Sequence, residues 1–223
     1  VILPKNGPPK ETDHRRIWQL FAEKYYLFQV TPTGIWLDYE LNIVFEIKQR
    51  LNADSAQSIF EQISEKINSP DFSPRSLFKR FKIDTLCTTD AVSDPLLSHK
   101  KIRASGWDGD IRPTFRPDSV TNLASIGWND NLSSLEKTSD VSITKYRDFI
   151  KALEKQREFF KKMGATATDH GITNLNINTI SENECERLFS QALNNDLSLQ
   201  STHRMWKNHF YHCESHGMAG GDP

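Results

Sequence analysis

The sequence predicts an α/β protein in which a helical block is followed by β/α units that form part of a larger β/α fold. Three observations lead to this prediction. Residues 12–81 show apolar residues at helical spacing and no strand pattern. From residue 82 onward the expected strands and helices alternate, which is typical of parallel β/α units. The expected strands are too few to close a barrel or to complete a doubly wound sheet.

Length and composition argue against a membrane-spanning protein and against a partner that is nucleic acid or a membrane surface. The 223 residues suffice for one large domain or two small ones. A formal net charge of −1 gives no electrostatic reason to expect nucleic acid or a membrane surface as a partner. No apolar run approaches the roughly 18 residues of a membrane span. The first residues lack a signal-peptide pattern and an initiator Met, so we expect a processed chain or a fragment. The distant Cys87, Cys185 and Cys213 predict free thiols and a cytoplasmic location.

The helical block begins after an irregular lead-in at residues 1–10, with Thr12 or Asp13 as the expected N-cap. The stretch Thr31-Pro32-Thr33-Gly34 ends the first helix and opens a second. A third helix is expected from Asp54-Ser55, and a short one follows at residues 75–80. Their expected inner faces are, in order, Ile17, Leu20, Phe21, Lys24, Tyr25 and Phe28; Ile35, Trp36, Tyr39, Leu41, Val44 and Phe45; and Ile59, Phe60, Ile63 and Ile67.

The β/α part contains three expected strands, at residues 83–90, 110–115 and 165–171. Between the first two, Ser93-Asp94-Pro95 is expected to cap a helix that Gly106 ends. Loops and short helices are expected over residues 119–140. A long helix over residues 143–163 follows, with an apolar face and with Gly164 as its C-terminal cap. Two further helices are expected at 181–193, which begins with a Ser181–Glu184 capping box, and at 198–216.

Polar residues gather where the expected strands end. They are Thr88, Thr89 and Asp90 on the first strand, Arg116 and Asp118 on the second, and Asp169 and His170 on the third. Ligands of parallel β/α folds bind at the carboxyl ends of the strands. A guanidinium donates two parallel hydrogen bonds to a carboxylate, and an aspartate beside it can accept a hydroxyl hydrogen bond or act as a general base.

Each of these residues also has a structural interpretation. Asp90 precedes a helix, so it can be an N-cap or turn residue. Arg116 can form a structural ion pair with Asp118. Asp169-His170 can form a turn in which the Asp side chain binds backbone amides. His209, His212, Cys213 and His216 are closely spaced, but the i, i+4 pair lacks the Glu of a His-Glu-x-x-His site, so we expect a helix rich in histidine rather than a zinc site.

Four stretches resemble the bacterial uronate (glucuronate) isomerases of the amidohydrolase superfamily. The first is Thr-Pro-Thr-Gly-Ile-Trp-Leu at 31–37, with Glu40-Leu41 behind it. The second is Thr88-Thr89-Asp90 with Asp94-Pro95-Leu96 and His99. The third is Pro-Thr-Phe-Arg-Pro-Asp at 113–118. The fourth is Phe159-Phe160 with Gly-Ala-Thr-Ala-Thr-Asp-His-Gly at 164–171. They stand in the family's order and cover the chain from about residue 12 to its end.

The resemblance implies a distorted (β/α)8 barrel, of which this chain carries three parallel strands. It divides the chain into a helical insertion subdomain at 1–81 and the β/α units of an incomplete barrel at 82–223. The implied reaction interconverts D-glucuronate with D-fructuronate, and D-galacturonate with D-tagaturonate, by aldose–ketose proton transfer. Arg116 matches the family's substrate-binding arginine and Asp169 the acidic residue that faces the active site, whereas His170 receives no role.

The resemblance also implies a divalent metal, zinc, whose ligands are not in this sequence. The family's His-x-His pair belongs before residue 1, and a further histidine and a metal-binding aspartate belong after residue 223. We therefore expect no metal site and no activity in the isolated chain. The expected partner is a small sugar acid, and assembly into a homo-oligomer stays open. A metal-dependent hydrolase of a carboxylated substrate and a non-catalytic interaction module are the alternatives, because fold does not decide function.

Overall fold

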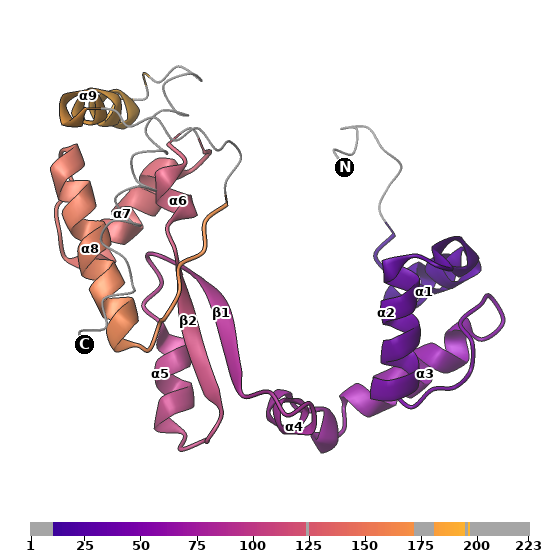
Figure 1. The fold of residues 1–223 in the computed structure, drawn as a ribbon. Helices are drawn as coiled ribbons and strands as arrows, with labels where there is room; N and C mark the ends of the chain where they lie inside the picture. Colours follow the sequence, from indigo (N-terminus) through magenta and orange to yellow (C-terminus); the bar gives the residue numbers. More distant parts are fainter. Residues whose placement is uncertain (1–10, 124, 172–180, 195, 197–223) are drawn as a thin grey trace. The chain divides into compact units, whose positions relative to one another are not determined.

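The computed structural model describes residues 11–123, 125–171, 181–194 and 196 of the chain (Figure 1). The chain divides into two compact units, Val1–Ile83 and Asp84–Pro223. The lead-in at 1–10, the expected helix at 198–216 and the four residues of its histidine cluster lie outside the described residues. None of the helices described combines the length and the apolar character that crossing a membrane requires.

The first unit consists of short helices whose starts follow local sequence signals. Asp13 is the N-cap of the first helix, and its carboxylate accepts hydrogen bonds from the Arg15 and Arg16 amides. Thr31 caps the second helix in the same way at Gly34 N. The elements are α1 (His14–Glu23), η1 (Tyr25–Phe28), α2 (Pro32–Tyr39), η2 (Glu40–Val44), α3 (Ala56–Ile67), η3 (Pro70–Phe72) and α4 (Pro74–Arg80).

Tyr25 lies at the centre of this unit's core. Its ring is 4% exposed, and its hydroxyl lies 2.8 Å from Asp38 Oδ1 and 3.0 Å from the Gly34 carbonyl oxygen. Burial, together with the neighbouring Asp38 carboxylate, raises the pKa of the Tyr25 phenol to about 12. The other buried apolar residues of the unit are Ala22, Leu41, Ile47, Leu51, Ala56 and Ile59.

The expected inner face of the second helix is wrong for its first three residues, whereas Leu41 is buried as expected. Ile35, Trp36 and Tyr39 are 62%, 68% and 59% exposed. Gly34 is instead the buried residue of α2, because this helix packs against the end of η1. A Cβ at Gly34 would lie 2.2 Å from the Phe28 carbonyl oxygen, so only glycine permits this approach. The close approach turns the side of α2 that carries Gly34 inward and leaves the larger apolar residues outside.

The second unit contains a parallel pair of strands, β1 (Thr85–Ala91) and β2 (Asp110–Arg116), joined by α5 (Leu97–Ala104). In the register, Thr88 is opposite Pro113 and Ala91 is opposite Arg116. The remaining helices are α6 (Asp118–Thr121), α7 (Trp128–Ser139), α8 (Tyr146–Lys162) and α9 (Glu182–Leu193). Parallel pairing with a helical crossover confirms the α/β class that the alternation of elements predicted.

The expected third strand at 165–171 is reduced to a single parallel bridge between Thr168 and Phe115. Phe115 N donates to Ala167 O over 3.2 Å, and Asp169 N donates to Phe115 O over 3.0 Å. Alternate residues of a strand direct their backbone groups to the same neighbour, so Pro113 and Pro117 share this edge with Phe115. Proline has no N–H, so neither of these positions can donate a hydrogen bond to the Thr168 segment. Residues 165–171 therefore run parallel to β2, as expected, but they pair with it at one residue only.

Phe115 also anchors the core beneath the strands. Its ring and that of Phe160 on α8 are fully buried and meet edge to face at 5.3 Å. Trp128, Tyr146, Phe149 and Phe189 continue the aromatic core toward α7 and α9. In Figure 1, α5 and α8 lie on the same side of the strand pair. Gly164, with φ of +84°, then reverses the chain from α8 toward the Thr168 bridge.

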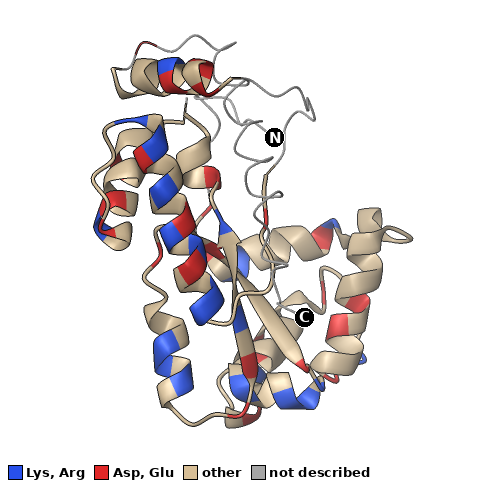
Figure 2. Cartoon of the chain, turned by 60° about the vertical axis from the view of Figure 1, so that its left-hand side comes forward, with Lys and Arg blue, Asp and Glu red and all other residues tan. Residues whose placement is uncertain are grey.

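Charged side chains of both signs occur in each of the two units, although several short elements carry one sign only, such as α4 and α5 with Lys and Arg. Figure 2 shows Lys and Arg interspersed with Asp and Glu along the helices and strands. This matches the near-neutral formal charge of the sequence.

We expect Phe160→Ala to lower the free energy of unfolding by about 3–5 kcal/mol, because it leaves a cavity beneath Phe115. Urea denaturation of the chain measures this change. Leu97→Ala on α5 is the control, since Leu97 is 57% exposed and its truncation is expected to change stability by about 0.5 kcal/mol or less. Equal losses for the two variants would contradict the assignment of Phe160 to the core.

We expect Asp148 to stabilise the start of α8 in a pH-dependent way. Its carboxylate accepts from Thr144 Oγ1 over 2.9 Å and from Thr144 N over 3.2 Å, and the hydroxyl hydrogen bond is the main cause that lowers the pKa of Asp148. A lowered pKa in the folded state gives stability that is present above the unfolded pKa and lost as the pH falls through the folded pKa. Asp148→Asn should therefore lower the melting temperature at neutral pH but not below about pH 3. The same decrease at both pH values would count against this role.

Candidate functional site

Arg116, Asp118 and Asp169 come together at the ends of two neighbouring parallel segments. Arg116 Nε lies 2.5 Å from Asp118 Oδ2 and 3.5 Å from Asp169 Oδ2. Asp169 reaches this position because Thr168 is opposite Phe115, which places the next residue of each segment side by side. The side chains of Arg116, Asp118 and Asp169 are 42%, 26% and 48% exposed, so a ligand can reach the cluster.

Asp118 connects both segments. Its Oδ2 binds Arg116, and its Oδ1 accepts a hydrogen bond from the Gly171 amide over 2.8 Å. The structural ion pair that the sequence left open for Arg116 is therefore formed. In a turn of the kind considered for Asp169-His170, Asp169 would bind a nearby backbone amide. The Gly171 amide donates to Asp118 instead. This bridge holds the end of the Thr168 segment against the end of β2.

The guanidinium of Arg116 retains an edge for a ligand. Its hydrogen bond to Asp118 uses Nε only, and no described residue forms a hydrogen bond with Nη1 or Nη2. The hydrogen bond to Asp118 and the charges of Asp118 and Asp169 raise the pKa of Arg116 above its ordinary value. A permanent cation with a fixed orientation and an outer pair of N–H groups suits a carboxylate ligand.

Thr88 and Asp90 form a second polar group, on the other face of β1. Thr88 Oγ1 lies 2.6 Å from Asp90 Oδ2 and 2.9 Å from Nε2 of His99 on α5, which is 6% exposed. The Thr88 hydroxyl has one proton, so donating it to Asp90 requires that His99 donate from Nε2. Asp90 lies 3.9 Å from the same Nε2. Here the Asp90 carboxylate and the Thr88 hydroxyl lie near the same nitrogen of His99, Nε2. In a hydrolase triad the carboxylate binds one ring nitrogen of the histidine and the hydroxyl binds the other, so this arrangement is not a triad.

The expectation that all strand-end residues join one site is therefore corrected. Side chains alternate between the faces of a strand, and Arg116 is opposite Ala91. Thr89 shares the face of Arg116, whereas Thr88 and Asp90 face α5. The N-cap interpretation of Asp90 is also wrong, because Asp90 lies within β1 and Asp94 Oδ1 accepts from Leu96 N over 2.6 Å. The contact of Thr88 with His99 was not predicted from the sequence. The alternation of side chains along β1 could have shown that Thr88 and Thr89 lie on opposite faces of the strand.

The described residues do not suit a metal ion. No three His, Cys, Asp or Glu side chains among them gather at a distance that would hold one. The strand-end cluster supplies two carboxylates, but the Arg116 guanidinium lies between them and would repel a cation. His170 is partly buried beside this cluster. Of the three cysteines, Cys87 is an exposed free thiol, Cys185 is a buried one, and Cys213 lies outside the described residues.

Comparison with known proteins gives a consistent result. A family model described as glucuronate isomerase matches residues 9–214. A uronate isomerase of Nostoc punctiforme is 49% identical over 191 residues, which are 86% of this chain and 40% of that protein. One from Brucella canis is 38% identical over 199 residues, covering 88% and 42%. The crystal structure of a glucuronate isomerase from Caulobacter crescentus superposes with a TM-score of 0.86 at 31% identity, covering 92% of this chain and 43% of that one.

The chain thus spans about two fifths of the length of the relatives it matches. The family model extends over nearly the whole chain and includes both the helical unit and the strand-end cluster. On this evidence, the chain belongs to the glucuronate isomerase family.

Proposed function

We propose that this chain is part of a uronate isomerase that interconverts D-glucuronate with D-fructuronate, and D-galacturonate with D-tagaturonate. The observation that carries the proposal is the convergence of Arg116 and Asp169 at adjacent parallel strand ends, in a chain of this family. The intact enzyme would act in the cytoplasm on a small sugar acid.

In the proposed reaction, Arg116 binds the carboxylate of the uronate. Asp118 occupies Nε and orients the guanidinium, so that Nη1 and Nη2 donate two parallel hydrogen bonds to the substrate. This contact fixes the sugar acid by the end that does not react. The reacting carbons then extend along the face that Asp169 shares.

Asp169 is the proposed base of the proton transfer. Its carboxylate would accept the proton from C2 of the open-chain aldose and leave an enediolate. Return of that proton to C1, with transfer of the C2 hydroxyl proton to the C1 oxygen, gives the ketose. Asp169 Oδ2 lies 3.5 Å from Arg116 Nε, so the proposed base stands beside the residue proposed to hold the substrate.

We further propose that residues 82–223 are β/α units of a (β/α)8 barrel and that residues 1–81 are a helical insertion. In support, β1, β2 and the Thr168 segment run parallel in one layer, and within the described residues β1 pairs along one edge only. The polar cluster stands at the carboxyl ends of these segments, where barrel enzymes bind their substrates. Zinc is the metal that we propose for the intact enzyme, held by segments outside this chain.

The first test is an assay of the intact parent protein with D-glucuronate and zinc, which follows the appearance of a ketouronate. Turnover would support the isomerase. A cleaved bond in place of a ketouronate would favour a hydrolase of the same superfamily. Absence of any reaction with glucuronate and galacturonate would contradict the isomerase and favour a hydrolase of the same superfamily.

We expect Arg116→Met in the intact enzyme to reduce kcat/KM by about tenfold or more, because it removes a bidentate, charge-assisted contact. Arg112→Met is the matched control. Arg112 lies on the same face of β2 but is paired with Asp110 at the other end of the strand. If the two variants lose activity equally, or if neither does, Arg116 has no special role in substrate binding.

We expect the isolated 223-residue chain to bind no stoichiometric metal and to show no isomerase activity. The reason is that the described residues bring no set of metal ligands together. Equilibrium dialysis with zinc, followed by metal analysis and the ketouronate assay, tests this. Stoichiometric zinc together with turnover would defeat the prediction.

A further inference from the structure

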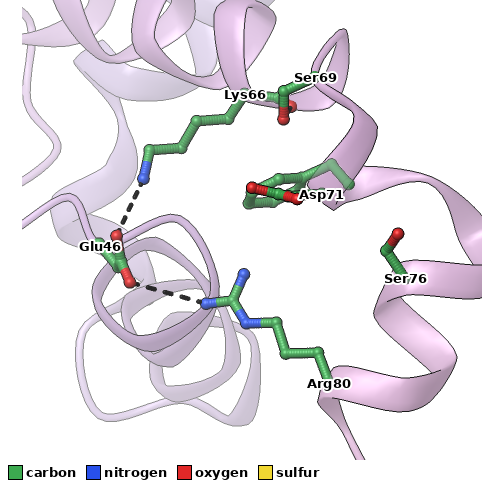
Figure 3. Close-up of a pocket in the computed structure, with 7 residues that line it drawn as sticks. Glu46, Lys66, Ser69, Asp71, Ser76 and Arg80 are labelled. Carbon is green, nitrogen blue, oxygen red and sulfur yellow. Dashed lines mark hydrogen bonds and ion pairs between the residues drawn. The ribbon is translucent and has the colours of Figure 1, made fainter.

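The helical unit contains a polar hollow of about 550 Å3 that the proposed reaction does not use. Every residue that lines it belongs to this unit, and Figure 3 shows the side chains directed into the hollow from η3, α4 and the end of α3. The lining residues are Glu46, Lys66, Ser69, Asp71, Phe72, Ser76 and Arg80.

Two cations meet a single carboxylate at one side of the hollow. Lys66 Nζ lies 3.2 Å from Glu46 Oε2, and Arg80 Nη2 lies 3.9 Å from Glu46 Oε1 (Figure 3). Arg80 is held independently of Glu46, because Nη2 donates to the Ile43 carbonyl over 3.2 Å and its guanidinium lies 5.5 Å from the centroid of the Phe72 ring. Arg80 therefore keeps its position whether or not Glu46 is bound to it. Its guanidinium and the Lys66 ammonium can then bind another carboxylate.

Glu46 is a replaceable partner for these cations. Its side chain is 70% exposed, while those of Lys66 and Arg80 are 32% and 35% exposed. Its backbone adopts a left-handed conformation, with φ of +56°, at the turn where Ile47 N donates to Leu41 O. That conformation is unfavourable for a residue with a Cβ and often marks a functional position. Exposed ion pairs of this kind are weak, so an external carboxylate can compete.

The other side of the hollow offers hydrogen-bond acceptors. Ser69 Oγ donates its proton to Lys66 O over 2.7 Å, and Ser76 Oγ donates to Pro70 O over 2.9 Å. The Ser69 oxygen therefore presents lone pairs and no proton to a ligand. The Ser76 oxygen also lies 2.8 Å from Ser73 Oγ, which donates to it, so it keeps one lone pair. The Asp71 carboxylate has no hydrogen bond or ion pair with the described residues, and it also accepts only. A complementary ligand must donate hydrogen bonds on this side.

We propose that this hollow binds a small polyhydroxy carboxylic acid. The carboxylate takes the place of the Glu46 side chain between Lys66 and Arg80, and Glu46 turns outward to solvent. The hydroxyl groups donate to Asp71, Ser69 and Ser76. The site is independent of the proposed isomerase reaction, since no residue of the strand-end cluster takes part.

The test titrates the full chain with gluconate and follows the heat of binding. Gluconate carries a carboxylate and a row of hydroxyls, acetate carries the carboxylate alone, and sorbitol carries the hydroxyls alone. We expect gluconate to bind with a Kd of about 1–10 mM and at least about fivefold more tightly than either comparator. Absence of gluconate binding in this range, or equal binding of acetate or sorbitol, would overturn the proposal.

Two substitutions give effects of opposite sign. Glu46→Gln removes the internal competitor and should tighten gluconate binding about fivefold, whereas Arg80→Gln should weaken it about tenfold. Lys79→Gln is the matched control, because it removes one positive charge from the same helix but not from the lining, and it should change Kd by less than about twofold. If Arg80→Gln lowers the melting temperature, Lys66→Gln replaces it with the same expected direction. Weaker or unchanged binding in Glu46→Gln would contradict the displacement of Glu46.

Discussion

The backbone pairing of Phe115 with residues 167–169 is the constraint on which the second unit depends. Its two hydrogen bonds join segments that are far apart in the sequence, and both neighbouring positions on that edge of β2 are prolines. The bridge alone therefore sets the register that brings Asp169 beside Arg116. The same residue buries its ring against Phe160, so that the site and the core share one anchor. A shift of one residue would turn Asp169 to the opposite face.

The alternation of the strands then divides the polar residues by function. Arg116, Asp169 and Thr89 share a face that is open to a ligand, while Thr88, Asp90 and His99 form a buried network behind β1. Buried polar groups of this kind are stable only when they satisfy one another, and the single proton of Thr88 fixes the direction of the network. Polar residues that adjoin in the sequence thus lie in an exposed cluster on one side of the sheet and in a hydrogen-bonded network on the other.

The helical unit shows a related division. Gly34 permits the close contact that orients α2, and this contact leaves Ile35, Trp36 and Tyr39 exposed. Glu46 adopts a backbone conformation that glycine would adopt without strain, yet its carboxylate meets two cations at the rim of a hollow. In both places a local backbone requirement decides which side chains face outward. The exposed apolar residues of α2 and the hollow proposed as a binding site both lie where the arrangement of side chains differs from the one that the apolar pattern of the sequence predicts.

By itself, the sequence determined the starts of α1, α2 and α9, the α/β class and the family, whereas α5 and α8 begin later than expected, at Leu97 and Tyr146. Asp13, Thr31 and Ser181 cap their helices through side chains that bind amides two or three residues on, and such local contacts can be read from spacing. The four family stretches likewise lie in short runs. The tertiary structure alone decided which face of α2 is buried, how far the Thr168 segment pairs, and which strand-end residues meet. Those outcomes depend on contacts whose geometry no local pattern records, such as the approach of Gly34 to the Phe28 carbonyl and the hydrogen bond between Asp118 and the distant Gly171.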